Sequence, residues 1–280
     1  MTGVVSHVSV VAGSDPVRGV AWQLARHPAD PRLAGLVVDA CGYTELSDRP
    51  VTRRQLPHPA VTVILNLGPP ISVDGVARRT FVAGMHDVWS TTEFTGAQCG
   101  VELRLTPLGA RRLLGMPADE LTNVVTPLPL LDRLAERLAA LPDWGQRLDV
   151  ALASVAADGP DPDPAVAWAW RVLRRRGGDV PIGALAAEIG WSRRHFATRF
   201  RAEIGLSPKV AARVLRLGQA RSLLVNGVPA GSVAARCGYT DQSHLVREFR
   251  ALAGCTPSAY VAELDGEQIT FVQDREPSAA

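Results

Sequence analysis

Two short runs of polar and basic side chains late in the chain have the chemistry needed to read base-pair edges. They comprise Arg193, Arg194, Ala197 and Thr198 in the first run, and Gln242, Ser243, His244 and Arg247 in the second. A guanidinium can donate two hydrogen bonds to O6 and N7 of guanine, and a glutamine amide can pair with adenine. Arg194 is the best candidate base reader. The alternative is that the arginines bind phosphate without reading sequence, and this alternative is stronger for Arg193.

The elements that must position these residues form an internal repeat. Phe196, Phe200, Arg201, Gly205, Ser207 and Pro208 recur as Leu245, Phe249, Arg250, Gly254, Thr256 and Pro257, each displaced by 49 positions. Upstream, Leu185-Ala186 and Gly190-Trp191 recur as Val233-Ala234 and Gly238-Tyr239, displaced by 48 positions. Each copy has a short helix with one apolar face, a Gly-aromatic turn and a second helix whose apolar residues are four apart. This is the pattern of a helix-turn-helix.

The junctions of each copy carry helix-start signals. Ser192 and Asp241 occupy equivalent positions and are expected to be N-caps. Ser207 and Thr256 each precede a proline, the preferred first residue of a helix. The helix predicted between the copies, 208–225, would be about 27 Å long at ~1.5 Å per residue. A connector of that length can hold two recognition helices near one turn of DNA apart, ~34 Å.

Charge is distributed unevenly along the 280 residues. Residues 165–262 hold 15 basic and 5 acidic side chains, a net charge of +10, whereas residues 1–164 hold 14 and 18 and the end from 263 is net −4. A basic segment of this size suggests a polyanionic partner, because each neutralised phosphate releases counterions. Double-stranded DNA is the leading candidate and a membrane surface is the alternative. Without a signal peptide or a long apolar run we expect a cytoplasmic protein.

The first half of the chain is expected to contain strands. Val61, Val63, Leu65 and Leu67 recur with period two, interrupted once by the apolar Ile64. Cys99, Val101, Leu103 and Leu105 alternate with Gly100, Glu102 and Arg104, and both runs are predicted to be half-buried strands. Turn-rich stretches between such runs favour an antiparallel sheet or small barrel. From Thr126 the leucines at 130, 131, 134, 138 and 141 form a helical stripe, followed by a helix at about 144–156. This helical pair either covers the sheet or forms a dimer interface.

A segment rich in proline and acid, 158–164, marks a domain boundary because it cannot propagate a helix. We predict an α+β chain with an N-terminal, mostly antiparallel β domain at 1–160, a helical DNA-binding domain at 164–262 and an acidic tail at 263–280. The helix at about 164–176 ends in three arginines. They suit a helix C-terminus whatever the function, so contact with phosphate is left open.

The segment from about 180 to 262 resembles the DNA-binding module of AraC-type transcription regulators. The resemblance is carried by Leu185-Ala186, Gly190-Trp191-Ser192, Phe196, Phe200-Arg201, Gly205, Ser207-Pro208, Arg216, Ala220, Leu223-Leu224, Val233-Ala234, Cys237-Gly238-Tyr239, Asp241, Ser243-His244-Leu245, Arg247, Phe249-Arg250, Gly254 and Thr256-Pro257-Ser258-Ala259-Tyr260. It implies a seven-helix module with two recognition helices.

By this resemblance the family's base-contact positions fall on Arg194, Ala197, Thr198, Gln242, Ser243, His244 and Arg247. Ala197 departs from the family pattern, because a longer polar side chain is common there and alanine offers only a methyl contact. We assign phosphate contacts to Ser192, Arg193, Arg201, Asp241 and Arg250. RNA polymerase, as the target of an activator, and a second copy of the chain are further expected partners.

Residues 1–160 are more weakly similar to the N-terminal domains that precede such modules, through Leu56-Pro57-His58 and the segment Thr106–Ala110. The resemblance implies a cupin-like barrel that senses a small effector, at residues that the sequence leaves unknown, or that dimerises. His58 and His86 stand alone, and the four cysteines show no metal-ligand spacing. We therefore expect no metal, no cofactor and no catalytic residues.

Two other functions are weighed against a sequence-specific regulator. A DNA-repair or other enzyme fused to the module would need an activated cysteine, but neither Cys41 nor Cys99 has a sequence partner to activate it. A nonspecific DNA-coating protein would show little discrimination between an operator and random duplex. The mixed polar residues on the outward faces of the recognition helices favour specificity.

Overall fold

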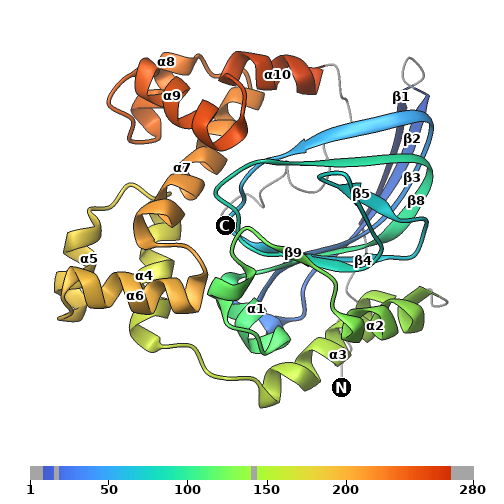
Figure 1. The fold of residues 1–280 in the computed structure, drawn as a ribbon, viewed down its shortest axis with the longest axis horizontal. Coiled ribbons are helices and arrows are strands. Elements are labelled where there is room, and N and C mark those ends of the chain that lie inside the picture. The colour runs from blue at the N-terminus through green and yellow to red at the C-terminus, as the bar shows by residue number, and fades with distance from the viewer. Residues whose placement is uncertain (1–8, 16–18, 140–143, 266–280) are drawn as a thin grey trace. The chain divides into compact units, whose positions relative to one another are not determined.

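The computed structural model describes residues 9–15, 19–139 and 144–265, which form two compact units (Figure 1). The first unit holds the described residues up to Pro162, apart from two short segments. The second unit holds the described chain from Asp163 together with those segments, Leu56–Pro59 and Met85–Trp89.

The first unit is built on a nine-stranded sheet whose pairings in the described residues are antiparallel. The strands are β1 (Ser9–Asp15), β2 (Val20–His27), β3 (Val37–Gln55), β4 (Val61–Asn66), β5 (Ile71–Val73), β6 (Val76–Arg78), β7 (Phe81–Ala83), β8 (Ser90–Leu105) and β9 (Val125–Thr126). Their order is β1-β2-β3-β8-β4-β7-β9, and β5 pairs with β6 and β8. Figure 1 shows this sheet curling, and the mostly antiparallel β architecture predicted for this half is confirmed.

The prediction of a half-buried strand is wrong for the end of β8, because both faces of the strand are buried from Gly100 to Leu105. Val101 and Leu103 are buried on one face as expected, but Glu102 and Arg104 on the other face are only 5% and 1% exposed. The Arg104 guanidinium is paired with the carboxylate of Asp39 on β3, its register partner. Polar side chains on a strand therefore did not mark a solvent-facing surface here, since a charge can be buried when it is paired.

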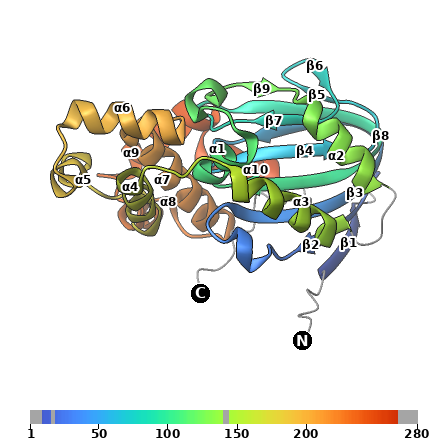
Figure 2. The same ribbon diagram turned by 90° about the horizontal axis from the view of Figure 1, so that it is seen from below.

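Helices pack against one face of the sheet. They are α1 (Pro107–Leu114), α2 (Pro129–Ala139) and α3 (Trp144–Asp158), with two short 3-10 turns at Pro31–Leu33 and Ala118–Leu121. Figure 2 shows α2 and α3 lying across the strands; α2 contacts β4, and its Leu131 and Leu138 are buried. The side chain of Leu130 and the whole of Leu141 lie outside the described residues. Covering the sheet is thus one role of this helical pair.

Helix α3 is attached to the sheet by a buried polar pair. His27 at the end of β2 and Asp149 on α3 approach to 2.7 Å between Nε2 and Oδ2, with side chains 2% and 11% exposed. Trp144 packs at an angle to the His27 ring, 5.7 Å between centroids. Gly145 lies so close that an added Cβ would meet His27 Nδ1 at 2.4 Å. The start of α3 is therefore held tightly against β2.

The second unit is helical, as predicted. Its helices are α4 (Pro164–Arg175), α5 (Ile182–Ile189), α6 (Arg193–Ile204), α7 (Pro208–Val225), α8 (Ala230–Arg236), α9 (Gln242–Ala253) and α10 (Pro257–Asp265). The predicted tail therefore begins inside α10, and residues 266–280 lie outside the described chain. Among the described residues, none of the helices has both the length and the apolar character needed to cross a lipid bilayer.

Candidate nucleic-acid interface

The first helix of each repeat ends at the predicted glycine turn. Gly190 caps α5 in the left-handed conformation, with φ 80°. Gly238 has φ 71° in the equivalent turn after α8. The amide of Trp191 donates to Ala186 O at 2.9 Å, and that of Tyr239 donates to Ala234 O at 3.0 Å. The two turns therefore share one backbone geometry, which glycine adopts without the strain a Cβ would add.

The second helices, α6 and α9, are 12 residues each and begin in the same way. Ser192 Oγ accepts a hydrogen bond from the amide of His195 at 3.2 Å, and Asp241 Oδ1 accepts from the amide of His244 at 2.6 Å. Each helix ends where a glycine amide donates to an arginine carbonyl at the equivalent position. The expected N-caps are therefore present in both copies.

The inward faces of α6 and α9 also correspond. Phe196 and Phe200 on α6, like Leu245 and Phe249 on α9, have no exposed surface. Phe200 meets Trp170 of α4 edge-on at 6.3 Å between ring centroids, and Phe249 packs against Tyr260 of α10 at 5.6 Å. Burying these faces fixes which side of each helix remains outside.

The structure places the residues predicted to read bases on the outward faces of α6 and α9. On α6, Arg194 and Thr198 are exposed and Ala197 is half-buried; on α9, Gln242, Ser243 and Arg247 are exposed and His244 is half-buried. Thr198 Oγ1 donates to Arg194 O at 3.1 Å, so its hydroxyl is partly used within the helix.

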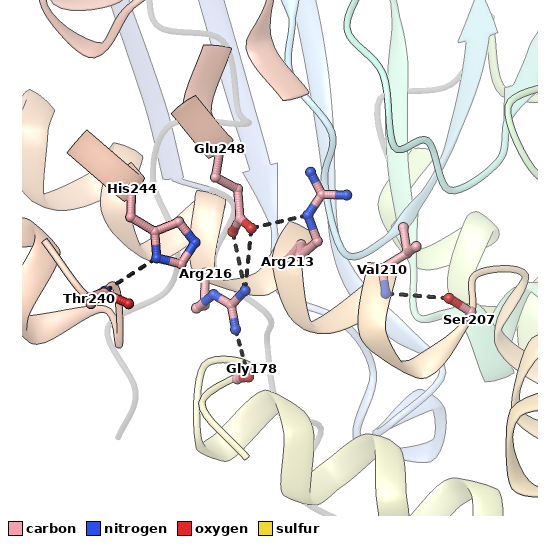
Figure 3. Close-up of polar contacts among 8 residues, drawn as sticks. All are labelled: Gly178, Ser207, Val210, Arg213, Arg216, Thr240, His244 and Glu248. Atoms are coloured by element: carbon pink, nitrogen blue, oxygen red, sulfur yellow. Dashed lines mark hydrogen bonds and ion pairs between the residues drawn. The ribbon is translucent and has the colours of Figure 1, made fainter. Parts of the chain in front are cut away.

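His244 is held in one orientation. Its Nδ1 accepts a hydrogen bond from the backbone amide of Thr240 at 3.3 Å (Figure 3), and its ring meets Tyr239 edge-on at 5.3 Å. Because a backbone amide can only donate, Nδ1 is the unprotonated nitrogen and Nε2 carries the hydrogen. His244 would therefore offer a donor to DNA, suited to guanine O6 or a purine N7.

The residues predicted to contact phosphate divide into two kinds. Arg193, Arg201 and Arg250 are exposed cations, and a Cβ added to Gly183 of α5 would lie 3.0 Å from the Arg193 guanidinium. Ser192 and Asp241 use their side-chain oxygens to cap helices. The Asp241 carboxylate accepts hydrogen bonds and repels phosphate, so a phosphate contact at this residue must come from its backbone amide.

Sequence reasoning missed a polar cluster between α9 and α7. Glu248, one helical turn after His244, accepts hydrogen bonds from Arg213 and Arg216 of α7 (Figure 3). The sequence held one signal for this cluster: the 49-residue offset aligns Glu248 with Arg199 of α6, so both repeats carry a charged residue at this position. Arg199 also makes an ion pair, donating to Asp163 at the start of α4 at 3.0 Å.

The first unit contains a separate cavity of about 510 Å³. It lies between the end of β4, the turn joining β6 to β7, and α2, and its charged lining residues are Arg78, Arg79, Asp132 and Glu136. Arg78 Nε is buried and has no hydrogen-bond partner among the described residues. This size lies within the range of small-molecule sites, ~300–1,000 Å³.

Thiol and metal chemistry gain no support from the described residues. Cys41 is fully buried, and burial raises the pKa of its thiol to about 11, with the nearby Glu102 carboxylate acting in the same direction. A thiol in this state is a poor nucleophile at neutral pH. Within the described chain, no three His, Cys, Asp or Glu side chains are grouped so that they could hold a metal ion.

Two paired units, each with an N-capped helix facing outward, define a tandem helix-turn-helix domain. Residues 185–263 match the family of helix-turn-helix domains, and residues 25–127 match a domain of unknown function (DUF6597). The C-terminal domain belongs to the AraC-type helix-turn-helix family, as its residues predicted.

Known proteins are similar to parts of this chain. The uncharacterized HTH-type transcriptional regulator YbfI of Bacillus subtilis (strain 168) is 33% identical over 67 residues, so the match spans 24% of this chain and 24% of that protein. The C-terminal domain of AraT from Geobacillus stearothermophilus, described as a response regulator, is 21% identical over 37% of this chain and 88% of its own, with a TM-score of 0.35. ToxT from Vibrio cholerae O395 is 11% identical over 78% of this chain and 98% of its own, with a TM-score of 0.47. At these scores the structural likenesses carry no argument about function.

Proposed function

We propose that the protein is a sequence-specific transcription regulator that binds promoter DNA through α6 and α9. The observation that carries the proposal is the matched pair of recognition helices, each with buried apolar residues on one side and exposed polar residues on the other. The segment 165–262 that contains them has a net charge of +10. Such a charge attracts the phosphate backbone at long range, and mixed polar groups on the outward faces read base edges.

Direct reading of bases falls to the seven outward residues predicted from the sequence. Arg194 and Arg247 are the strongest of them, because both are exposed and form no ion pair among the described residues. Exposed Arg193, Arg201 and Arg250 neutralise phosphates and set the position of the domain on the duplex. Since this function requires access to chromosomal DNA, we place the protein in the bacterial cytoplasm.

We further propose that a small effector binds the first unit, and its cavity suggests the chemistry of that ligand. Arg78 and Arg79 can hold a carboxylate or phosphate. Asp132 and Glu136, one turn apart on α2, can hold an ammonium group. A small zwitterion therefore suits this cavity better than an apolar molecule. Contact with RNA polymerase and assembly of two copies complete the proposed mode of action.

An enzyme fused to the module is the less favoured function. The methyl-accepting or nucleophilic cysteine that such an enzyme needs is not matched by Cys41, whose thiol is buried and protonated at neutral pH. The features described are therefore explained by a regulator without any catalytic residue.

The test is selection of bound duplexes from a random pool, followed by titration of variants on the enriched sequence. We expect Arg247→Ala to cost ~1–3 kcal/mol on that site and to relax the preference at one base pair. Arg250→Ala, the matched control at a phosphate position, should weaken all sequences about equally and lower the salt dependence. Failure to enrich any sequence, or equal losses for Arg247→Ala on every duplex, would contradict sequence-specific binding.

A further inference from the structure

Arg199 and Glu248 occupy equivalent positions in the two repeats and carry opposite charges, but both form an ion pair with a neighbouring helix. Each lies on a recognition helix and forms an ion pair with the helix that precedes its own helix-turn-helix. Arg199 of α6 pairs with Asp163, the N-cap of α4, and Glu248 of α9 pairs with Arg213 and Arg216 of α7. The repeat therefore includes an attachment point for the recognition helix, separate from the residues that face DNA.

The attachment in the second repeat is more buried and involves more groups. The Glu248 side chain is 10% exposed, and those of Arg216 and Arg213 are 19% and 28% exposed. Arg213 Nε donates to Glu248 Oε2 at 3.1 Å, and Arg216 Nη2 donates to Glu248 Oε1 at 3.2 Å. The Arg216 guanidinium also lies over the Tyr239 ring, 5.6 Å from its centroid.

A further hydrogen bond of Arg216 reaches the segment that leads into the first helix-turn-helix. Its Nη1 donates to the carbonyl of Gly178, in the turn between α4 and α5, at 3.5 Å (Figure 3). The next residue, Asp179, approaches the turn of the second repeat so closely that a Cβ on Gly238 would lie 2.8 Å from its carboxyl carbon. One guanidinium therefore joins a carboxylate on α9 to the turn that leads into the first helix-turn-helix, and Asp179 of the same turn lies close to the turn of the second repeat.

We propose that Glu248 and Arg216 are positioning residues that fix the two helix-turn-helix units relative to each other, and so set the spacing of the two DNA half-sites. The inference rests on the proposed function in DNA binding. The connector α7 is a continuous helix, but a rigid connector fixes the recognition helices only if each unit is also locked onto it. The fork of Arg216 can hold both units at once because its planar donors point in two directions.

The experiment compares half-site spacings. The probe is a two-half-site duplex enriched with the wild-type chain, prepared with the original spacing and with one or two base pairs inserted between the half-sites. Binding through two linked sites gains about 10²–10⁴-fold in affinity, and that gain is lost when geometry forbids simultaneous contact. We expect the wild type to lose at least about tenfold for one inserted base pair, and Glu248→Gln and Arg216→Lys to lose less than about threefold.

Arg199→Gln is the matched control, since it breaks the equivalent attachment without touching the link between repeats. It should retain the wild-type preference for spacing even if its affinity falls on every duplex. Arg216→Lys keeps the charge opposite Glu248 but lacks the fork, so it tests the inference even if Glu248→Gln does not fold.

The outcomes separate the two proposals. If the wild type enriches no duplex, the proposed function fails and this inference falls with it. If the wild type discriminates between spacings and folded Glu248→Gln and Arg216→Lys keep the same discrimination, the positioning role is refuted while the proposed function stands. A uniform loss of affinity on all spacings also refutes it, because that is the effect of lost charge or stability alone.

Discussion

The buried pair between His27 and Asp149 should be the main polar attachment of α3 to the sheet. The two atoms lie 2.7 Å apart, and the side chains are 2% and 11% exposed. Removing the Asp149 carboxylate leaves the imidazole buried without its hydrogen-bond partner, which costs about 1–3 kcal/mol. We therefore expect Asp149→Ala to lower the stability of the first unit by about 2 kcal/mol.

Differential scanning calorimetry can measure this loss. In a unit of this size each kcal/mol shifts the melting temperature by about 2–4 °C, so the first-unit transition should fall by about 4–8 °C. Asp48→Ala is the matched control, because the Asp48 side chain is 68% exposed and lies 3.9 Å from Arg49; it should change stability by less than about 0.5 kcal/mol.

A double-mutant cycle decides whether the pair itself is responsible. If His27 and Asp149 stabilise each other, His27→Ala combined with Asp149→Ala should cost at least about 1 kcal/mol less than the sum of the single changes. Strict additivity, or an Asp149→Ala loss no larger than that of the Asp48→Ala control, would refute the reasoning.

Three further predictions concern single residues. Asp241→Ala should lower stability by about 1 kcal/mol through loss of the α9 N-cap, measured by urea denaturation, and Asp241→Asn should restore most of it; equal losses for both would contradict a capping role. Burial acts to raise the pKa of Asp163, but hydrogen bonds from Arg199 and two backbone amides hold it below 3.8. Its carboxylate therefore contributes stability above about pH 4 that is lost as pH falls through the lowered pKa, so melting curves of Asp163→Asn and wild type should converge in acid but differ at pH 7; a constant difference would argue against this. Finally, Cys41, with a pKa of about 11, should react with iodoacetamide at pH 8 much more slowly in the folded than in the urea-unfolded chain, as mass spectrometry of its peptide can show.

The helical half of the fold could be predicted in detail because its determinants are local. Caps, glycine turns and apolar spacing all lie within a few residues of what they control, so the start of α7 at Pro208 and the buried Phe196 and Leu245 followed from short-range patterns. The repeat added an independent check, since every assignment in one copy had to hold in the other.

The sheet was less predictable because its buried charges are explained by distant partners. Arg104 alternates with apolar residues and so resembled a solvent-facing residue, but its partner Asp39 lies 65 positions earlier. Nothing in the local pattern of β8 shows that the polar face is buried too. The same reason applies to Glu248, whose partners on α7 are 32 and 35 positions away.

The reversed polarity at Arg199 and Glu248 limits how the two repeats can be exchanged. A chimera carrying the α6 sequence in place of α9 would bring an arginine against Arg213 and Arg216, and the reciprocal swap would bring a glutamate against Asp163. Like charges would then meet in half-buried places, where repulsion is poorly screened. Redesign of DNA preference by grafting should therefore move only the base-reading side chains and leave Arg199 and Glu248 with their native counterions.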